Sequence, residues 1–187
     1  MRKLVLIVHT SLDGFVAGPQ GELHDFDPGE DNLAFVASLT ETADAAMFGR
    51  VSYELLEAHW PHAKDELDVS PAAKKYSNWY SSAQKIIISK TLDLPDSSVI
   101  IIRENLKDSV EKIKASSGKD ILIFGSPSLA QHLMEDNLID QYWIFINPVI
   151  FGKGIQLYPK GSDLKKFTLV KQEVFPNGEI ALCYEKQ

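Results

Sequence analysis

Short apolar runs of strand length recur along this chain, and they constrain its fold more than any other feature of the sequence. They are LVLIV (4–8), AAMF (45–48), KIIIS (85–89), VIIIR (99–103), ILIF (121–124) and YWIFINPVIF (142–151). Most are continuous and do not alternate with polar residues, which is typical of strands covered on both faces. Segments with helical spacing lie between them, at 31–41, 50–58, 71–82, 106–116 and 127–136. This alternation predicts an α/β fold with mainly parallel pairing.

The C-terminal part of the chain has a different pattern. FTLVKQEVF and EIALCYEK flank Pro-Asn-Gly, and Asn177-Gly178 readily supplies the positive backbone angles of a tight hairpin. We therefore expect a mixed sheet that is parallel first and antiparallel last. The polar stretch 61–70 is expected to be a surface loop. Because no repeat or linker divides the 187 residues, we expect one domain spanning 1–187.

Charge and composition exclude several classes of protein. A formal charge of −7 disfavours a broad electrostatic grip on nucleic acid, although it leaves room for a local basic pocket. No apolar run approaches the roughly 18 to 20 residues needed to cross a bilayer, so no membrane partner is expected. The single cysteine, Cys183, cannot form an intrachain disulfide, and its alternating surroundings predict a packed strand residue. A cytoplasmic location fits these features.

Glycines and polar residues follow three of the apolar runs. After ILIF, Ser126 is expected to cap the next helix through its side-chain oxygen, and Pro127 to occupy the first helical position. The free N–H groups and the dipole of such a helix end also favour phosphate. Gly49-Arg50-Val51-Ser52 forms a second junction and Ser89-Lys90-Thr91 a third.

Open α/β sheets bind ligands beyond the carboxyl ends of their strands, so these junctions together predict an extended anionic ligand. Each junction taken alone also has an ordinary explanation, as a helix cap or a solvated strand end. Neither GxGxxG entering a helix nor GxxxxGK[ST] is present, so a standard dinucleotide fold or P-loop is not expected.

Five motifs in order carry a resemblance that covers nearly the whole chain: SLDGFVAG, FGRVSYE, ISKTL, FGSPSLAQHL and NPVIFGKGIQLY. The chain resembles the dihydrofolate-reductase-like superfamily. Within it, the chain is most similar to stand-alone relatives of the C-terminal reductase domain of the bifunctional riboflavin-biosynthesis deaminase-reductase. The resemblance implies a three-layer fold with a mixed, mainly parallel sheet, flanking helices and NADPH bound across the carboxyl ends of the strands.

The resemblance also implies which residues hold the cofactor. Those along its phosphates would be Gly49, Arg50 and Ser52. Those around the adenosine 2′-phosphate would be Ser89, Lys90 and Thr91. Those around the pyrophosphate and the nicotinamide side would be Gly125, Ser126, Pro127, Ser128 and Leu129. Many members of the family have two successive glycines where this chain has Gly125-Ser126, so backbone approach to the cofactor is less free here.

Asp13 is the candidate catalytic residue. It leaves the first apolar run near the place that the resemblance gives to nicotinamide and substrate, where it can bind the substrate or help to deliver a proton. Asp-Gly is equally a common turn pair, and both interpretations stay open. The alternative carboxylates are Asp25, Asp27, Glu30 and Asp31. The five histidines have no recognisable metal-ligand spacing, so no metal is expected.

The function expected from the resemblance is an NADPH-dependent reductase that transfers hydride to a small pterin- or pyrimidine-like heterocycle. It would be similar to 5-amino-6-(5-phosphoribosylamino)uracil reductase. The alternatives are a non-catalytic NADP(H)-binding sensor or assembly module, and a fold that binds no nucleotide. The apolar run IDQYWIFINPVIF, taken as an exposed edge, predicts a homodimer.

Overall fold

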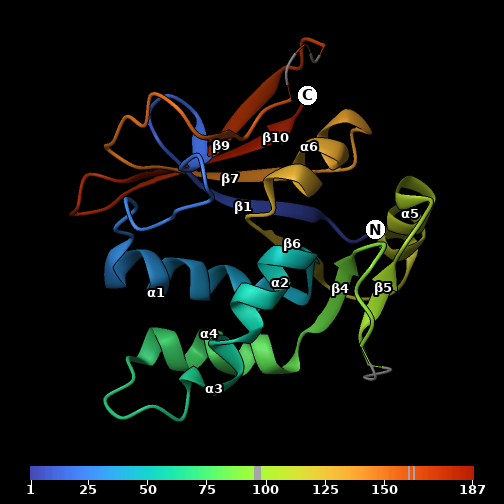
Figure 1. The fold of residues 1–187 in the computed structure, drawn as a ribbon, viewed down its shortest axis with the longest axis horizontal. Coiled ribbons are helices and arrows are strands. Elements are labelled where there is room, and N and C mark those ends of the chain that lie inside the picture. The colour runs from blue at the N-terminus through green and yellow to red at the C-terminus, as the bar shows by residue number, and fades with distance from the viewer. Residues whose placement is uncertain (95–97, 160, 162) are drawn as a thin grey trace.

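The computed structural model describes residues 1–94, 98–159, 161 and 163–187, and within them the chain forms one mixed eight-stranded sheet (Figure 1). In spatial order its strands are β5 (Ile100–Ile102), β4 (Gln84–Ile88), β3 (Ala43–Gly49), β6 (Asp120–Phe124), β1 (Leu4–Thr10), β7 (Gln141–Ile146), β10 (Ile180–Lys186) and β9 (Phe167–Val174). The first six run parallel, whereas β10 is antiparallel to β7 and β9. Two short strands, β2 (Phe15–Ala17) and β8 (Ile155–Gln156), pair separately.

Helices cover both faces of the sheet. They are α1 (Gly29–Leu39), α2 (Arg50–Glu57), α3 (Trp60–Ala63), α4 (Pro71–Ser82), α5 (Leu106–Ala115) and α6 (Pro127–Glu135), with a 3-10 turn at Thr40–Thr42. α1 to α4 lie on one face, and α5 and α6 lie on the other (Figure 1). This confirms the predicted three-layer, dihydrofolate-reductase-like fold. In the part of the chain that is described, no helix is long and apolar enough to cross a membrane.

β1 shows why the apolar runs are continuous. Leu4, Leu6 and Val8 pack in the core beneath α5 and α6, whereas Val5 and Ile7 pack in the core beneath α1 to α4. All five side chains are buried, so a polar residue at any of these positions would enter an apolar layer. Cys183 of β10 is buried as well, and desolvation raises the pKa of its thiol to about 11, which confirms its interpretation as a packed strand residue.

The C-terminal hairpin confirms one expectation and overturns another. The turn at Phe175–Glu179 places Gly178 at φ +87°, as predicted, whereas Asn177 does not have a positive φ. The run 139–151 is not an exposed edge, however, because its strand β7 pairs with β1 on one side and with β10 on the other. The hairpin covers it, so the edge at this end of the sheet is β9. The short α3 also occupies part of the stretch expected to be loop.

An ion pair between the buried Lys114 and the partly exposed Asp140 fixes the amino-terminal ends of β1 and β7 to α5. The Lys114 Nζ lies 2.6 Å from Oδ2 of Asp140 and donates a hydrogen bond of 2.7 Å to the Leu138 carbonyl. The same Asp140 oxygen accepts the N–H of Leu4 at 2.8 Å. A lysine so deeply buried requires a compensating charge, so Asp140 holds three elements in register.

We predict that Asp140→Ala lowers the free energy of unfolding by about 3 kcal/mol, because it leaves the Lys114 ammonium buried without a counter-charge. Urea denaturation measures the loss. The control is Glu41→Ala, which removes the partner of Lys75 from an exposed pair and is expected to cost at most about 0.5 kcal/mol. Equal effects of the two substitutions would contradict the anchoring role of Asp140.

Candidate cofactor and substrate site

A crevice is expected where neighbouring strands send their helices to opposite faces of the sheet. β3 continues into α2, whose Tyr53 packs in the core beneath α1 to α4. β6 lies beside β3 and continues into α6, whose Leu129 and Leu133 pack in the other core. Their carboxyl ends therefore form a topological switch point, the usual ligand position in an open α/β sheet.

A hydrogen bond joins the two strand-to-helix junctions across this switch point. The backbone N–H of Gly49 donates to Oγ of Ser126 at 2.9 Å. A Cβ atom added to Gly125 would lie 4.0 Å from Oγ of Ser52, so that hydroxyl also reaches the second junction. The structure thus brings together Gly49, Ser52, Gly125 and Ser126, which the sequence places in two distant motifs.

The expectation that Ser126 caps α6 through its side chain is wrong. Gly125 and Ser126 both have left-handed backbones, with φ of +56° and +52°, and the serine oxygen is used by β3 instead. α6 has no side-chain cap, and Pro127 at its first position has no N–H. The N–H groups of Ser128 and Leu129 therefore remain at an uncapped helix end, which favours an anionic ligand.

Arg50 lies beside this cradle on the outer surface of α2. Its side chain is half exposed, and Nη1 contacts both carboxylate oxygens of Glu54, one helical turn later, at 2.9 and 3.0 Å. Exposed pairs of this kind contribute little to stability. The Arg50 guanidinium can therefore leave Glu54 and bind a phosphate at a small cost in free energy.

The third predicted junction lies at the carboxyl ends of β4 and β5. The buried Ser89 is used within the turn, where its Oγ accepts the N–H groups of Leu92 at 3.0 Å and Thr91 at 3.3 Å. Lys90 and Thr91 are exposed. The structure adds Arg103, whose Nη1 lies 3.4 Å from the Lys90 carbonyl. Its signal was present in the sequence, because Arg103 ends the VIIIR run.

Asp13 connects two loops. Its carboxylate accepts hydrogen bonds from Oγ of Ser11 at 2.7 Å and from the N–H groups of Phe151 at 3.1 Å and Gly152 at 2.7 Å. The pKa of Asp13 is lowered, first by the Ser11 hydroxyl and then by these backbone donors. The bonds favour the ionised form, so their stabilising effect is present at neutral pH and is lost as the pH falls through the lowered pKa. An ionised carboxylate is a poor proton donor. These contacts do not test whether Asp13 takes part in catalysis, which stays a prediction.

The alternative carboxylates Asp25, Asp27, Glu30 and Asp31 are all exposed. Asn32, the next residue of α1, points inward instead, and its Nδ2 donates to Oε2 of Glu179 at 2.6 Å. Nδ1 of His9 lies 2.8 Å from the other oxygen of this buried glutamate. Sequence reasoning did not single out either His9 or Glu179. The available signal was their strand phase, since His9 follows Val5 and Ile7 at two-residue spacing and Glu179 precedes Ala181 and Cys183.

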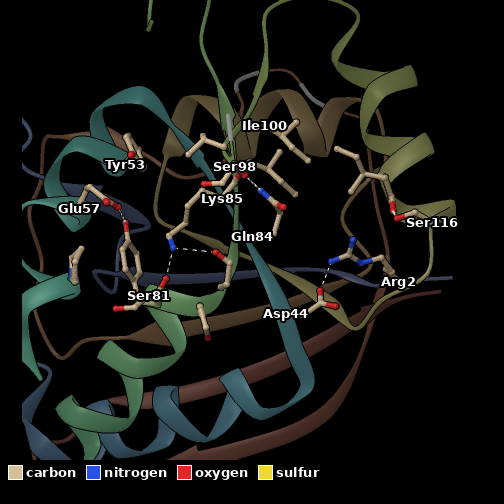
Figure 2. Close-up of a pocket in the computed structure, with 17 residues that line it drawn as sticks. Arg2, Asp44, Tyr53, Glu57, Ser81, Gln84, Lys85, Ser98, Ile100 and Ser116 are labelled. Atoms are coloured by element: carbon tan, nitrogen blue, oxygen red, sulfur yellow. Dashed lines mark hydrogen bonds and ion pairs between the residues drawn. The ribbon is translucent and has the colours of Figure 1, made fainter. Parts of the chain in front are cut away.

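A separate hollow of about 720 Å³ opens at the amino-terminal ends of the strands (Figure 2). The Arg2–Asp44 pair and the first residues of β4 line it. None of the predicted cofactor residues is among the side chains that form its wall. Among the described residues, no three His, Cys, Asp or Glu side chains gather closely enough to hold a metal ion.

The three-layer fold, with its topological switch point between β3 and β6, is that of a dihydrofolate-reductase-like domain. The chain belongs to the family described as the RibD C-terminal domain, whose model matches residues 2–181. It is 27% identical over 183 residues to the Bacillus subtilis protein YyaP, which is described as uncharacterized, covering 98% of this chain and 94% of that protein.

Solved structures of the same fold agree with this assignment. A putative riboflavin biosynthesis protein from Shewanella sp. PV-4 superposes with a TM-score of 0.73 at 24% identity, over 100% of this chain and 99% of that one. A diaminohydroxyphosphoribosylaminopyrimidine deaminase/5-amino-6-(5-phosphoribosylamino)uracil reductase from Thermotoga maritima gives 0.68 at 17% identity, over 100% of this chain and 57% of that one. Dihydrofolate reductase from Enterococcus faecalis complexed with NADP(H) gives 0.65 at 14% identity, over 99% and 96%.

We predict that Ser126→Ala lowers the free energy of unfolding by about 1 to 3 kcal/mol, because the Gly49 N–H loses its acceptor. Ser126→Gly is expected to cost about 1 kcal/mol less than Ser126→Ala, since glycine adopts the left-handed backbone without strain. Chemical denaturation of both variants checks the order. Ser128→Ala at the exposed neighbouring position is the control, and equal losses in all three variants would contradict the bridge.

Proposed function

We propose that the protein is an NADPH-dependent reductase that acts on a small pterin- or pyrimidine-like heterocycle. The observation that carries this proposal is the cradle at the switch point, where Gly49 and Ser126 are hydrogen-bonded beside the uncapped end of α6. An uncapped helix end next to close-approaching backbone suits a pyrophosphate. The dihydrofolate reductase of similar fold, which was solved with NADP(H), supports the choice of cofactor.

Each junction has its own role in this proposal. Gly49, Arg50 and Ser52 contact the phosphates, together with the α6 end formed by Gly125, Ser126, Pro127, Ser128 and Leu129. Ser89 shapes the turn that presents Lys90 and Thr91 to the 2′-phosphate. Arg103 adds a second cation there. NADPH supplies the hydride when bound, and the chain supplies orientation and electrostatics.

The substrate is placed beyond the carboxyl ends of β1 and β7. Two loops meet there, because the Leu12 N–H donates to the Val149 carbonyl at 2.8 Å and Asp13 holds the backbone of Phe151. The Phe151 ring stacks on Phe26 with centroids 5.1 Å apart, so aromatic faces suited to a flat heterocycle are present. In this proposal Asp13 acts by positioning the loop that carries Phe151.

One pair of measurements tests the function against its alternatives. NADPH binding is measured by calorimetry, and NADPH oxidation is followed against a panel of pterins, pyrimidines, quinones and small carbonyl compounds. Oxidation with one class of compound supports the reductase. Binding without oxidation across the panel favours a cofactor-binding sensor or assembly module. Absence of NADPH binding would contradict both proposals.

We predict that Arg50→Ala weakens NADPH binding roughly tenfold to hundredfold, because one charge-assisted phosphate contact is lost. NADH binding is expected to weaken less, since NADH carries less negative charge. Glu54→Ala, which only frees Arg50, is expected to leave NADPH affinity intact or raise it. Lys112→Ala on α5 is the control for a change of charge elsewhere. An unchanged NADPH dissociation constant in folded Arg50→Ala would remove Arg50 from the site.

We also propose that the protein is a homodimer that pairs through β9. This strand ends the sheet in the part of the chain that is described, and it exposes Leu169, Val170 and Val174. An exposed apolar edge strand favours pairing with a second copy. This interface differs from the one expected from the sequence, because the run IDQYWIFINPVIF lies within the sheet and not at its edge.

Light scattering is predicted to give twice the chain mass of 20.9 kDa for the native protein. Leu169→Lys combined with Val170→Lys replaces two exposed apolar side chains of the edge strand by charges and is expected to give monomers. Leu67→Lys, at an exposed loop position, is the matched control. A native protein of monomer mass at every working concentration would refute the dimer.

A further inference from the structure

Glu179 is a fully buried carboxylate that its neighbours only partly satisfy. Its side chain is 0% exposed, and Oε2 accepts a hydrogen bond of 2.6 Å from Asn32. Oε1 is buried and accepts no hydrogen bond within the described residues, although Nδ1 of His9 lies 2.8 Å away. Burial of a carboxylate without full compensation is costly, so a feature of this kind in a folded protein calls for a functional explanation.

His9 connects this buried charge to solvent. Its ring stacks on Phe145 with centroids 4.9 Å apart, and its side chain is 27% exposed. Because Nδ1 faces Glu179, the opposite nitrogen Nε2 faces away from the buried carboxylate, and in the described part of the chain Nε2 has no hydrogen-bond partner. The histidine thus has one nitrogen at a buried charge and one that is available to a ligand.

The position of His9 relates it to the cradle. β1 lies beside β6, and Ile7 pairs with Phe124, the last residue of β6, so His9 lies two residues beyond the level at which β6 passes into the Gly125-Ser126 junction. Phe26 lies on the other side of the ring, with centroids 6.2 Å apart, and Phe151 stacks on Phe26. His9 therefore lies near the carboxyl end of β1, beside the strand that leads into the proposed cofactor cradle, and its ring is near Phe26 in the loops proposed for the substrate.

We propose that His9, held by the buried carboxylate of Glu179, binds the heterocyclic substrate through Nε2 and donates the proton that accompanies its reduction. This inference rests on the proposed reductase function. Glu179 is then a positioning residue that fixes the ring and stabilises its positive charge. Asp13 is less suited to donate this proton, because the three hydrogen bonds that it accepts favour the ionised carboxylate.

The step balances with the cofactor as reductant. The carbon of a C=N or C=O bond in the substrate receives hydride, two electrons and one hydrogen, from the nicotinamide. The π electrons of that bond move to the heteroatom, which takes the proton from Nε2 of His9. The double bond is reduced, the cofactor is oxidised, and the imidazole regains its proton from water at its exposed edge.

The first test does not require turnover. Histidine ring signals are recorded by NMR on protein labelled with ¹⁵N-histidine and saturated with NADP⁺, and the His9 signals are assigned by their absence from His9→Gln. Addition of 6-methylpterin, or of the other panel heterocycles in turn, is expected to shift the His9 signals and to leave those of His59 unchanged. His59 is the matched control, because it also lies near a glutamate, Glu66, but in an exposed pair with 3.6 Å between the atoms.

The second test uses a substrate that the panel identifies. His9→Gln and Glu179→Gln are expected to lower kcat by about 100-fold or more, since proton donation acts in the transition state. His9→Gln is also expected to raise KM, because a substrate contact is lost, while the NADPH dissociation constant stays nearly unchanged in both variants. His59→Gln and Glu66→Gln are expected to retain native kcat. Circular dichroism confirms folding. If His9→Gln does not fold, Glu179→Gln, which preserves the shape of the side chain, carries the test.

The outcomes separate this inference from the function on which it rests. Failure of NADPH to bind contradicts the reductase function. Shifted His9 signals without oxidation of NADPH support the binding role of His9 and contradict catalysis. Unshifted His9 signals with every heterocycle, or native kcat in folded His9→Gln, overturn the inference even if the protein is a reductase.

Discussion

The burial of β1 on both faces is the constraint on which the rest of the structure depends. Its side chains belong alternately to the two cores, and its neighbours β6 and β7 are aligned on it residue by residue. The Asp140 contact to the Leu4 N–H fixes one end of this arrangement. At the other end, where the chain leaves the sheet, the same alignment determines which polar residues of β1, β6 and β7 meet. The buried apolar residues of β1 thus determine the position of the polar residues at the carboxyl ends of the strands.

That edge is organised by hydrogen bonds between distant segments. Ser126 receives the Gly49 N–H, Asp13 receives the N–H groups of Phe151 and Gly152, and Glu179 receives the Asn32 amide. Each bond joins a residue at a strand end to a loop or helix from another part of the chain. The groups that would contact a cofactor or substrate are therefore held before a ligand arrives, which lowers the entropy lost on binding.

The sequence predicted the strands of the large sheet and all of the α-helices except α3, because their signals are local, but it did not predict the short strands β2 and β8. Continuous apolar runs identified the parallel strands, and Gly-Arg, Ser-Lys and Gly-Ser junctions identified the strand ends that reach the crevice. The direction of the Ser126 hydroxyl was not predictable from the sequence. It depends on the left-handed backbone of Ser126 and on the N–H of Gly49, which lies 77 positions away in the chain. The pairing of His9 with Glu179 is more distant still, and β9 replaced β7 as the exposed edge only because the hairpin folds back.

Two carboxylates at this edge occupy opposite environments, and their chemistry follows from that difference. Asp13 is exposed and accepts three hydrogen bonds, which lower its pKa and hold it as an anion. Glu179 is sealed from water, and one of its oxygens has only an imidazole nearby. Asp13 therefore suits a role in holding the loop that carries Phe151, whereas Glu179 lies beside the imidazole of His9, whose side chain is partly exposed. A carboxylate next to one ring nitrogen fixes the orientation of an imidazole, and this arrangement of Glu179 and His9 is the basis of the proposed proton donation.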